Sequence, residues 1–145
     1  PKMEDYNSGA KNGETLTTVR QYLKQEQERF IPIPVDINTL TMQEKEVYNK
    51  TDAILKLIGG IPKNVRNIII VEKIYESEAF NETLGLWVPI DNSIIIKRNQ
   101  LKSIKQYSGT LLHECAHAIS GKDDLSRGFE LELTEMLGII SSKFV

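Results

Sequence analysis

The sequence predicts a single α+β domain: a small mixed or antiparallel sheet of about three strands packed on two C-terminal helices, with further helices N-terminal to it. Segments 65–74, 84–90 and 93–97 are short, apolar and rich in β-branched residues, which indicates strands. Segments 108–120 and 126–142 carry apolar residues three and four apart, which is the spacing of a buried helix face. With 145 residues, the chain is long enough to bury one core of its own.

The N-terminal part carries weaker signals. Residues 1–13 contain Asn, Ser, Gly and charged residues with little to bury, so we expect a flexible arm or linker there. Residues 14–145 are expected to form the single domain, beginning with a helix over 15–30 that ends before Pro32 and Pro34. The sequence does not begin with methionine, so we expect either the C-terminal part of a longer protein with an upstream domain or a processed product.

Local signals mark the ends of the other elements. Thr41 is followed three residues later by Glu44, a capping-box pattern that predicts the start of a helix ending at Gly59–Gly60. The turn-forming pair Asp91–Asn92 separates two of the expected strands. Gly121 is expected to end the helix over 108–120.

Composition excludes several classes of function. Apolar residues make up 40% of the chain and charged residues 26%, as in ordinary globular proteins. The net charge of −2 gives no basic footprint for nucleic acid, and no apolar run is long enough to span a membrane or to act as a signal peptide. The single cysteine, Cys115, cannot form an intrachain disulfide and fits a reducing cytoplasm. We therefore expect a cytoplasmic protein without nucleic-acid or membrane partners.

The most informative motif is His113-Glu114-Cys115-Ala116-His117, which contains both histidines of the chain. Residues four apart share one face of a helix, so His113 and His117 can point their imidazoles at one ion. Glu114 lies roughly 100° around the helix from His113, which places it beside a water on that ion rather than among the ligands. Zinc lowers the pKa of such a water and a carboxylate can accept its proton. The motif predicts one Zn²⁺ per chain, with His113 and His117 as ligands and Glu114 as the catalytic base.

Hydrolytic zinc sites usually take three protein ligands and leave one position for water. Since no third histidine exists, we expect a carboxylate, and the downstream candidates are Asp123, Asp124, Glu130, Glu132 and Glu135. We favour Glu130, because it lies near the start of the last helix and because Leu133 and Leu137 are expected to turn its side of that helix inward. Asp123 is the alternative.

The alternative rests on spacing. Asp123 follows His117 at the distance used by short-loop zinc peptidases, although Ser120 stands where that pattern has glycine. Glu132 and Glu135 lie off the expected apolar stripe and are expected to face solvent.

The stretches 111–118 and 128–134 resemble gluzincins, the zinc peptidases in which H-E-x-x-H is followed by a glutamate on a later helix. The stretch 84–89 lies upstream of the motif, where thermolysin-like peptidases place the edge strand that pairs with substrate. Together, residues 65–145 resemble the small metallopeptidase domains appended to the C-terminus of bacterial Hsp90-like ATPase proteins. Two departures are that the chain is much shorter than large gluzincins, and that Thr134 stands where thermolysin-like enzymes have aspartate.

The resemblance implies a zincin-like fold and a zinc metalloendopeptidase acting on a peptide or protein substrate. The strand containing Trp87 would then bind substrate main chain to main chain, with Trp87 in a side-chain pocket or in the core. Tyr107, Arg127 and Tyr75 are the candidate donors to the oxyanion. Two alternatives stay open: an inactive or structural zinc-binding module that serves regulation or protein interaction, and a regulatory domain gated by an upstream partner domain.

Overall fold

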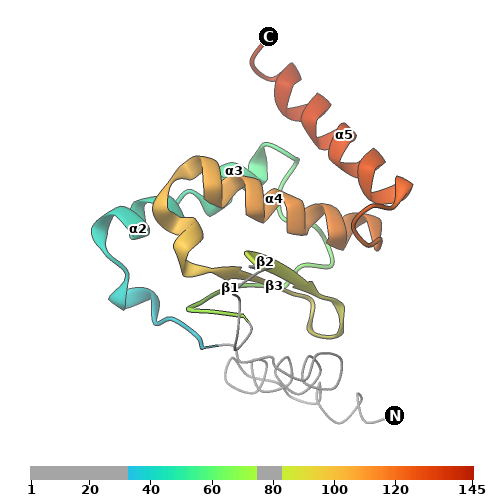
Figure 1. Ribbon diagram of the computed structural model, residues 1–145. Helices are drawn as coiled ribbons and strands as arrows, with labels where there is room; N and C mark the ends of the chain where they lie inside the picture. The colour runs from blue at the N-terminus through green and yellow to red at the C-terminus, as the bar shows by residue number, and fades with distance from the viewer. Residues whose placement is uncertain (1–32, 75–82) are drawn as a thin grey trace, which may run out of the picture.

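The computed structural model describes residues 33–74 and 83–145 (Figure 1). The helices and strands in chain order are α2 (Met42–Tyr48), α3 (Thr51–Lys56), β1 (Asn67–Val71), β2 (Gly85–Val88), β3 (Ser93–Lys97), α4 (Ile104–Ser120) and α5 (Arg127–Ser142). Three short 3-10 helices, Ile37–Thr39, Pro89–Asp91 and Arg98–Lys102, connect them. The described residues therefore form the expected mixture of helices with a small sheet. The arm at 1–13, the helix at 15–30 and Tyr75 lie outside these residues.

The three strands form one mixed sheet in the order β1-β3-β2. β1 pairs with β3 in parallel, with Ile69 opposite Ile95, whereas β2 pairs with β3 antiparallel, with Trp87 opposite Ile94. All five residues of β3 are buried, as expected for a central strand. On the outer side of β1, the amide of Val35 donates to the carbonyl of Ile70 at 3.0 Å. β2 is the other edge strand of the described sheet.

The turn between β2 and β3 follows its sequence signal. Asn92 has a φ of 53°, a left-handed conformation that asparagine tolerates better than most residues. Its amide donates to the carbonyl of Pro89 at 3.2 Å, which closes the turn. The prediction of two strands joined at Asp91–Asn92 is thereby confirmed.

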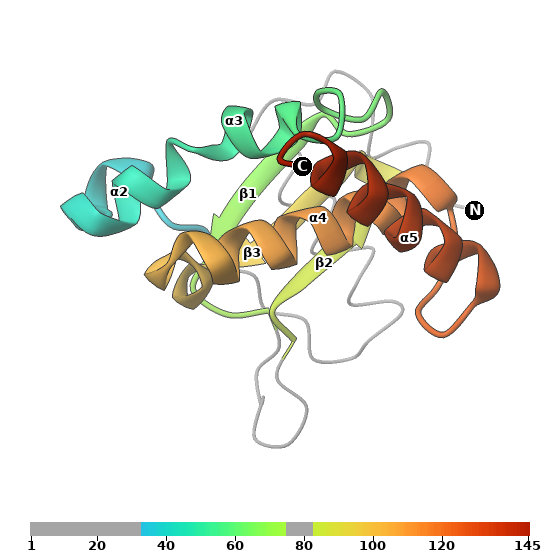
Figure 2. The same cartoon turned by 90° about the horizontal axis from the view of Figure 1, so that it is seen from above.

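Helix α4 lies across one face of the sheet, and α2 and α3 contact it (Figures 1 and 2). Side chains alternate along each strand, so Ile70, Ile94 and Ile96 join the main core with Leu111 of α4. The opposite face holds a second apolar cluster built on Val71, Ile74, Val88 and Ile95. The sheet is therefore buried on both faces, and α4 is fixed to one of them.

Helix ends agree with most local signals. Thr41 and Glu44 form the expected capping box, but the segment they begin is divided into α2 and α3 instead of one helix. Gly121 caps α4 with a φ of 65°, where a side chain would be strained. Ser126 caps α5 through a bond from the amide of Phe129 to its hydroxyl. None of the helices in the described ranges has the length and apolar character needed to cross a membrane.

Helix α5 packs on the end of α4 and extends away from the sheet (Figure 1). Its buried side carries Phe129 and Met136, with Leu133 partly buried against the main core. Leu137 was expected on the same side but is 67% exposed. The apolar stripe of α5 is thus narrower than the sequence predicts. Its position determines which of the neighbouring glutamate side chains point toward α4 and which point into solvent.

Candidate metal centre

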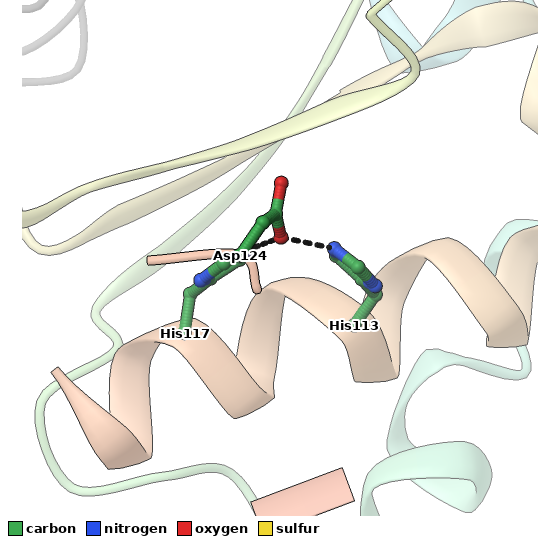
Figure 3. A group of neighbouring side chains, drawn as sticks. All are labelled: His113, His117 and Asp124. Carbon is green, nitrogen blue, oxygen red and sulfur yellow. Dashed lines mark hydrogen bonds and ion pairs between the residues drawn. The ribbon is translucent and has the colours of Figure 1, made fainter. Parts of the chain in front are cut away.

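The two histidines of the motif lie one turn apart on α4 and converge with an aspartate on one point (Figure 3). Oδ1 of Asp124 lies 3.2 Å from Nε2 of His113 and 2.8 Å from Nε2 of His117. One ligand atom from each residue falls within 4.8 Å of the others, so the three could hold a metal ion. The described residues contain no other group of histidine, cysteine or carboxylate side chains that meets this criterion.

Asp124 reaches the histidines because the connection between the two helices is short. The left-handed turn at Gly121 ends α4, and Ser126 begins α5 five residues later. Within this connection the hydroxyl of Ser126 donates to the carbonyl of Asp123 at 2.8 Å, and Leu125 adopts a φ of 65°. Asp123, the alternative third ligand predicted from the sequence, is exposed and lies outside the group.

Glu130, the favoured third ligand, is not brought to the histidines. It is exposed, as are Thr134 and Leu137 on the same side of α5. The expectation that Leu133 and Leu137 would turn this side inward is wrong, because Phe129 and Met136 set the buried direction instead. Glu130 follows Phe129 by one residue and so lies roughly 100° around the helix from the buried side. Glu132 and Glu135 are outside the group as well.

The ring of His117 is oriented by the main chain. Its Nδ1 lies 2.7 Å from the carbonyl oxygen of Lys122. Because a carbonyl only accepts, Nδ1 carries the proton and the lone pair of Nε2 faces Asp124. A lone pair and a carboxylate oxygen attract each other at 2.8 Å only with a positive centre between them, which is a proton or a metal ion. Such an orienting bond is typical of metal-binding histidines.

Phe129 is a component of the site that the sequence analysis assigned only to the core. Its ring stacks on His117 with centroids 4.1 Å apart and planes at 17°, and it meets His113 edge-on at 4.9 Å. The apolar spacing of α5 indicated that Phe129 is buried, and it is 4% exposed. No sequence signal indicated that histidines would be its neighbours.

Glu114 occupies the buried side of the site, with an exposed fraction of 6%. Burial raises the pKa of its carboxyl to about 7; the positive charge of His117 opposes this shift and the negative charge of Asp124 adds to it. The main-chain amide of Trp87 in β2 donates a hydrogen bond to the carboxylate, which favours its ionised form. The carboxyl is thus held between α4 and the edge strand with its proton affinity near neutrality.

The edge strand passes directly over α4 at this point. A Cβ atom on Gly85 would lie 2.7 Å from Cγ2 of Thr110 and 3.2 Å from Cγ of Glu114, so only glycine allows this approach. In the antiparallel register, Leu84 and Leu86 turn their main-chain groups toward β3, as the bond from the amide of Lys97 to Leu84 requires. Gly85 and Trp87 therefore turn theirs toward the side of β2 that no other described strand covers, where the amide of Trp87 meets Glu114.

The three tentative substrate residues have different placements. Tyr107 is fully buried in the core, its hydroxyl 2.7 Å from that of Thr51, and burial raises its pKa to about 12. Its assignment as an oxyanion donor is corrected, because its side of α4 is the side of Leu111 and Cys115 and not that of the histidines. Arg127 is exposed in the first turn of α5. Trp87 is partly buried against the main core and contributes its amide to Glu114.

No family model, no curated protein and no solved structure matches this chain. Two imidazole nitrogens and a carboxylate oxygen suit zinc and several other divalent transition metals. Zinc bonds of 2.0–2.2 Å at tetrahedral angles put neighbouring ligand atoms roughly 3.3 Å apart. The distances from Asp124 to the two histidines, 3.2 and 2.8 Å, are close to this value, and all three ligand atoms lie within 4.8 Å of one another.

Proposed function

We propose that the chain is a zinc-dependent metallopeptidase with His113, His117 and Asp124 as its metal ligands and Glu114 as its catalytic base. One observation carries the proposal. The histidine–aspartate group lies beside a buried carboxylate that is itself bonded to the main chain of β2, an edge strand of the sheet that residues 33–74 and 83–145 form. Ligands, base and a strand for peptide binding therefore meet at one place, which is the combination that peptide hydrolysis needs.

The openness of the group favours a catalytic over a structural metal. Structural zinc sites are closed by four protein ligands, whereas catalytic sites keep a position for water. Among the residues that the structure describes, three converge on this point, and the side chain of His113 is 42% exposed. When bound, zinc supplies Lewis acidity that lowers the pKa of water and polarises a carbonyl group.

Glu114 is suited to move a proton between water and the leaving amine. A general base works best with a pKa near the operating pH, and burial has raised that of Glu114 to about 7. The amide of Trp87 fixes the direction of the carboxylate. Glu114 takes a proton from the attacking water and then delivers it to the amine that leaves the scissile bond.

The substrate class follows from the edge strand. The amide and carbonyl of Gly85 and the carbonyl of Trp87 turn outward and can pair with an extended peptide, whereas the amide of Trp87 is bonded to Glu114. Main-chain pairing accepts any peptide or unfolded protein segment, while side-chain pockets would restrict the sequence. A peptide or protein substrate is therefore proposed, and the sheet edge supplies its alignment with the metal group.

Glu114→Gln tests the proposal. The Zn²⁺-loaded protein and the variant are compared on a library of fluorescence-quenched peptides, with zinc content measured by atomic emission. The variant should keep its zinc and lose hydrolysis by roughly 10²–10⁴-fold, the usual contribution of a general base. Thr110→Ser is the matched control, because it alters the same face of α4 one turn away without removing an ionisable group.

Two outcomes would contradict the proposal. Cleavage that survives in Glu114→Gln would exclude Glu114 as the base. A zinc-loaded wild-type protein that cleaves no peptide of the library would favour the other reading of the motif, a zinc-binding module used in regulation or protein interaction.

A further inference from the structure

We propose that Phe129 is a positioning residue that holds both histidine rings in their metal-binding orientation and thereby makes α5 part of the metal site. The inference rests on the proposed metal site and extends it to a residue that cannot bind a metal. Phe129 contacts both imidazoles through its ring, stacked on His117 and edge-on to His113, whereas Asp124 contacts them through a carboxylate oxygen. It is almost completely buried, so its own position is fixed.

The two histidines need such a support because the connection that faces them is exposed. The side chain of His113 is 42% exposed and that of Asp124 is 66% exposed. When Asp124 moves away, His113 keeps no hydrogen bond among the described residues, whereas the ring of His117 is still held by the carbonyl of Lys122. A flat apolar ring against both imidazoles removes the alternative rotamers without competing for the metal. Burial fixes the ring of Phe129, and the fixed ring restricts the rotation of the two imidazoles.

The placement of Phe129 depends on the start of α5. The amide of Phe129 donates to the hydroxyl of Ser126 at 3.1 Å, which fixes the first turn of the helix. Asp124 precedes this cap by two residues. The third ligand and the supporting ring therefore lie at the same end of α5, so a metal that binds Asp124 also holds the start of α5 on α4. This coupling between metal binding and the packing of α5 on α4 is reciprocal, so loss of the ring should lower the affinity for the metal.

Co²⁺ titration of the full chain tests the inference, because the visible spectrum of Co²⁺ reports on ligand geometry as well as affinity. Phe129→Leu keeps an apolar side chain and removes the ring; Phe129→Tyr keeps the ring. We expect Phe129→Leu to bind Co²⁺ about 10-fold more weakly, at the lower end of the range for partners that orient a ligand, with an altered spectrum. Phe129→Tyr should keep the Co²⁺ affinity and the spectrum of the wild-type protein. Met136→Leu, on the same buried side of α5, should leave both unchanged.

Failure of the metal site and failure of the inference give different results. A wild-type protein that does not bind Co²⁺ contradicts the metal site itself. Wild-type binding together with unchanged affinity and spectrum in Phe129→Leu overturns the role of Phe129 alone. If Phe129→Leu does not fold, hydrogen exchange of the wild-type protein decides: Co²⁺ should slow exchange of the α5 amides, and equal exchange with and without Co²⁺ overturns the coupling.

Discussion

The two sides of the metal group differ in how firmly the fold holds them. On one side, Glu114 is 6% exposed, lies beneath the backbone of Gly85 and accepts the amide of Trp87. On the other, Asp124 belongs to the connection between α4 and α5, its side chain is 66% exposed and its hydrogen-bonding contacts are with the histidines. The base is built into the sheet and helix, whereas the third ligand comes from the surface.

This difference indicates an order of assembly. The sheet and α4 form the main core, so the base and the two histidines are arranged by folding alone. Asp124 completes the group through charge, since its position depends on a positive centre shared with the histidines. Changes on the buried side should therefore affect stability and catalysis, while changes on the exposed side should affect metal binding and leave the fold intact.

Replacement of the third ligand should give the largest effect. Asp124→Asn removes the charge with little change of size and should weaken Zn²⁺ binding by roughly 10³-fold, since loss of a group that merely orients a ligand already costs 10–100-fold. Thermal unfolding of the metal-free variant should match that of the wild-type protein. Affinity is measured by competition with a chromophoric chelator.

Glu130→Gln is the matched control for Asp124→Asn. It removes an exposed carboxylate from the first turn of α5, so Zn²⁺ affinity should be unchanged. Weak binding in Glu130→Gln with normal binding in Asp124→Asn would restore the gluzincin-like ligand set and require α5 to turn so that Glu130 faces the histidines. That result would contradict the site described here.

The predictable half of the site is the half that depends on local spacing. His113, Glu114 and His117 are fixed relative to one another by a single helix, and Gly121 and Ser126 mark where that helix ends and the next begins. The strands and their turn follow from β-branched runs and from Asn92 in the same way. Each of these features is set by residues within a few positions of one another.

The third ligand could not be predicted in this way. Whether Asp124 or Glu130 meets the histidines depends on how α5 is rotated about its own axis when it packs on α4. Phe129 settles that rotation by inserting between the helices against both imidazoles, and Leu137 is left in solvent. The burial of Tyr107 could not be predicted from the sequence either, because only the packed structure shows which face of α4 meets Thr51.

The buried side should also reveal itself in the pH dependence of stability. In metal-free protein the pKa of Glu114 rises from 4.5 in the unfolded chain to about 7, mainly through burial. Between these pH values the folded protein holds a proton that the unfolded chain has released. The free energy of unfolding should therefore fall as pH rises from 4.5 through 7, by on the order of 3 kcal/mol, and level off above.

Glu114→Gln isolates this contribution. Denaturant unfolding in the presence of a chelator is measured for both proteins across the pH range, and their difference isolates the contribution of Glu114 to first order. The difference should decline over the stated window. A difference that is constant with pH would mean that Glu114 is as well solvated in the folded protein as in the unfolded chain. The side of the site next to β2 would then be open to water.

The smallest effect concerns the contact between the edge strand and α4. Gly85→Ala places a Cβ 2.7 Å from the methyl group of Thr110 and against the side chain of Glu114. We expect a loss of about 1–3 kcal/mol in the free energy of unfolding, the usual range for overpacking, together with reduced peptide hydrolysis as β2 moves away from α4. Unfolding and hydrolysis are measured on the same preparations.

Two further variants show whether the contact itself is responsible. Thr110→Ser removes the methyl group but keeps the hydroxyl that donates to Gln100 at 2.7 Å, so it should restore much of the stability when combined with Gly85→Ala. Gly109→Ala, in the middle of α4 with no atom within 4 Å of its added Cβ, should instead stabilise the protein by roughly 0.5–1 kcal/mol. If the double variant is as unstable as Gly85→Ala alone, the strain comes from Glu114 rather than Thr110, and the strand would be fitted to the catalytic base more closely than to the helix that carries it.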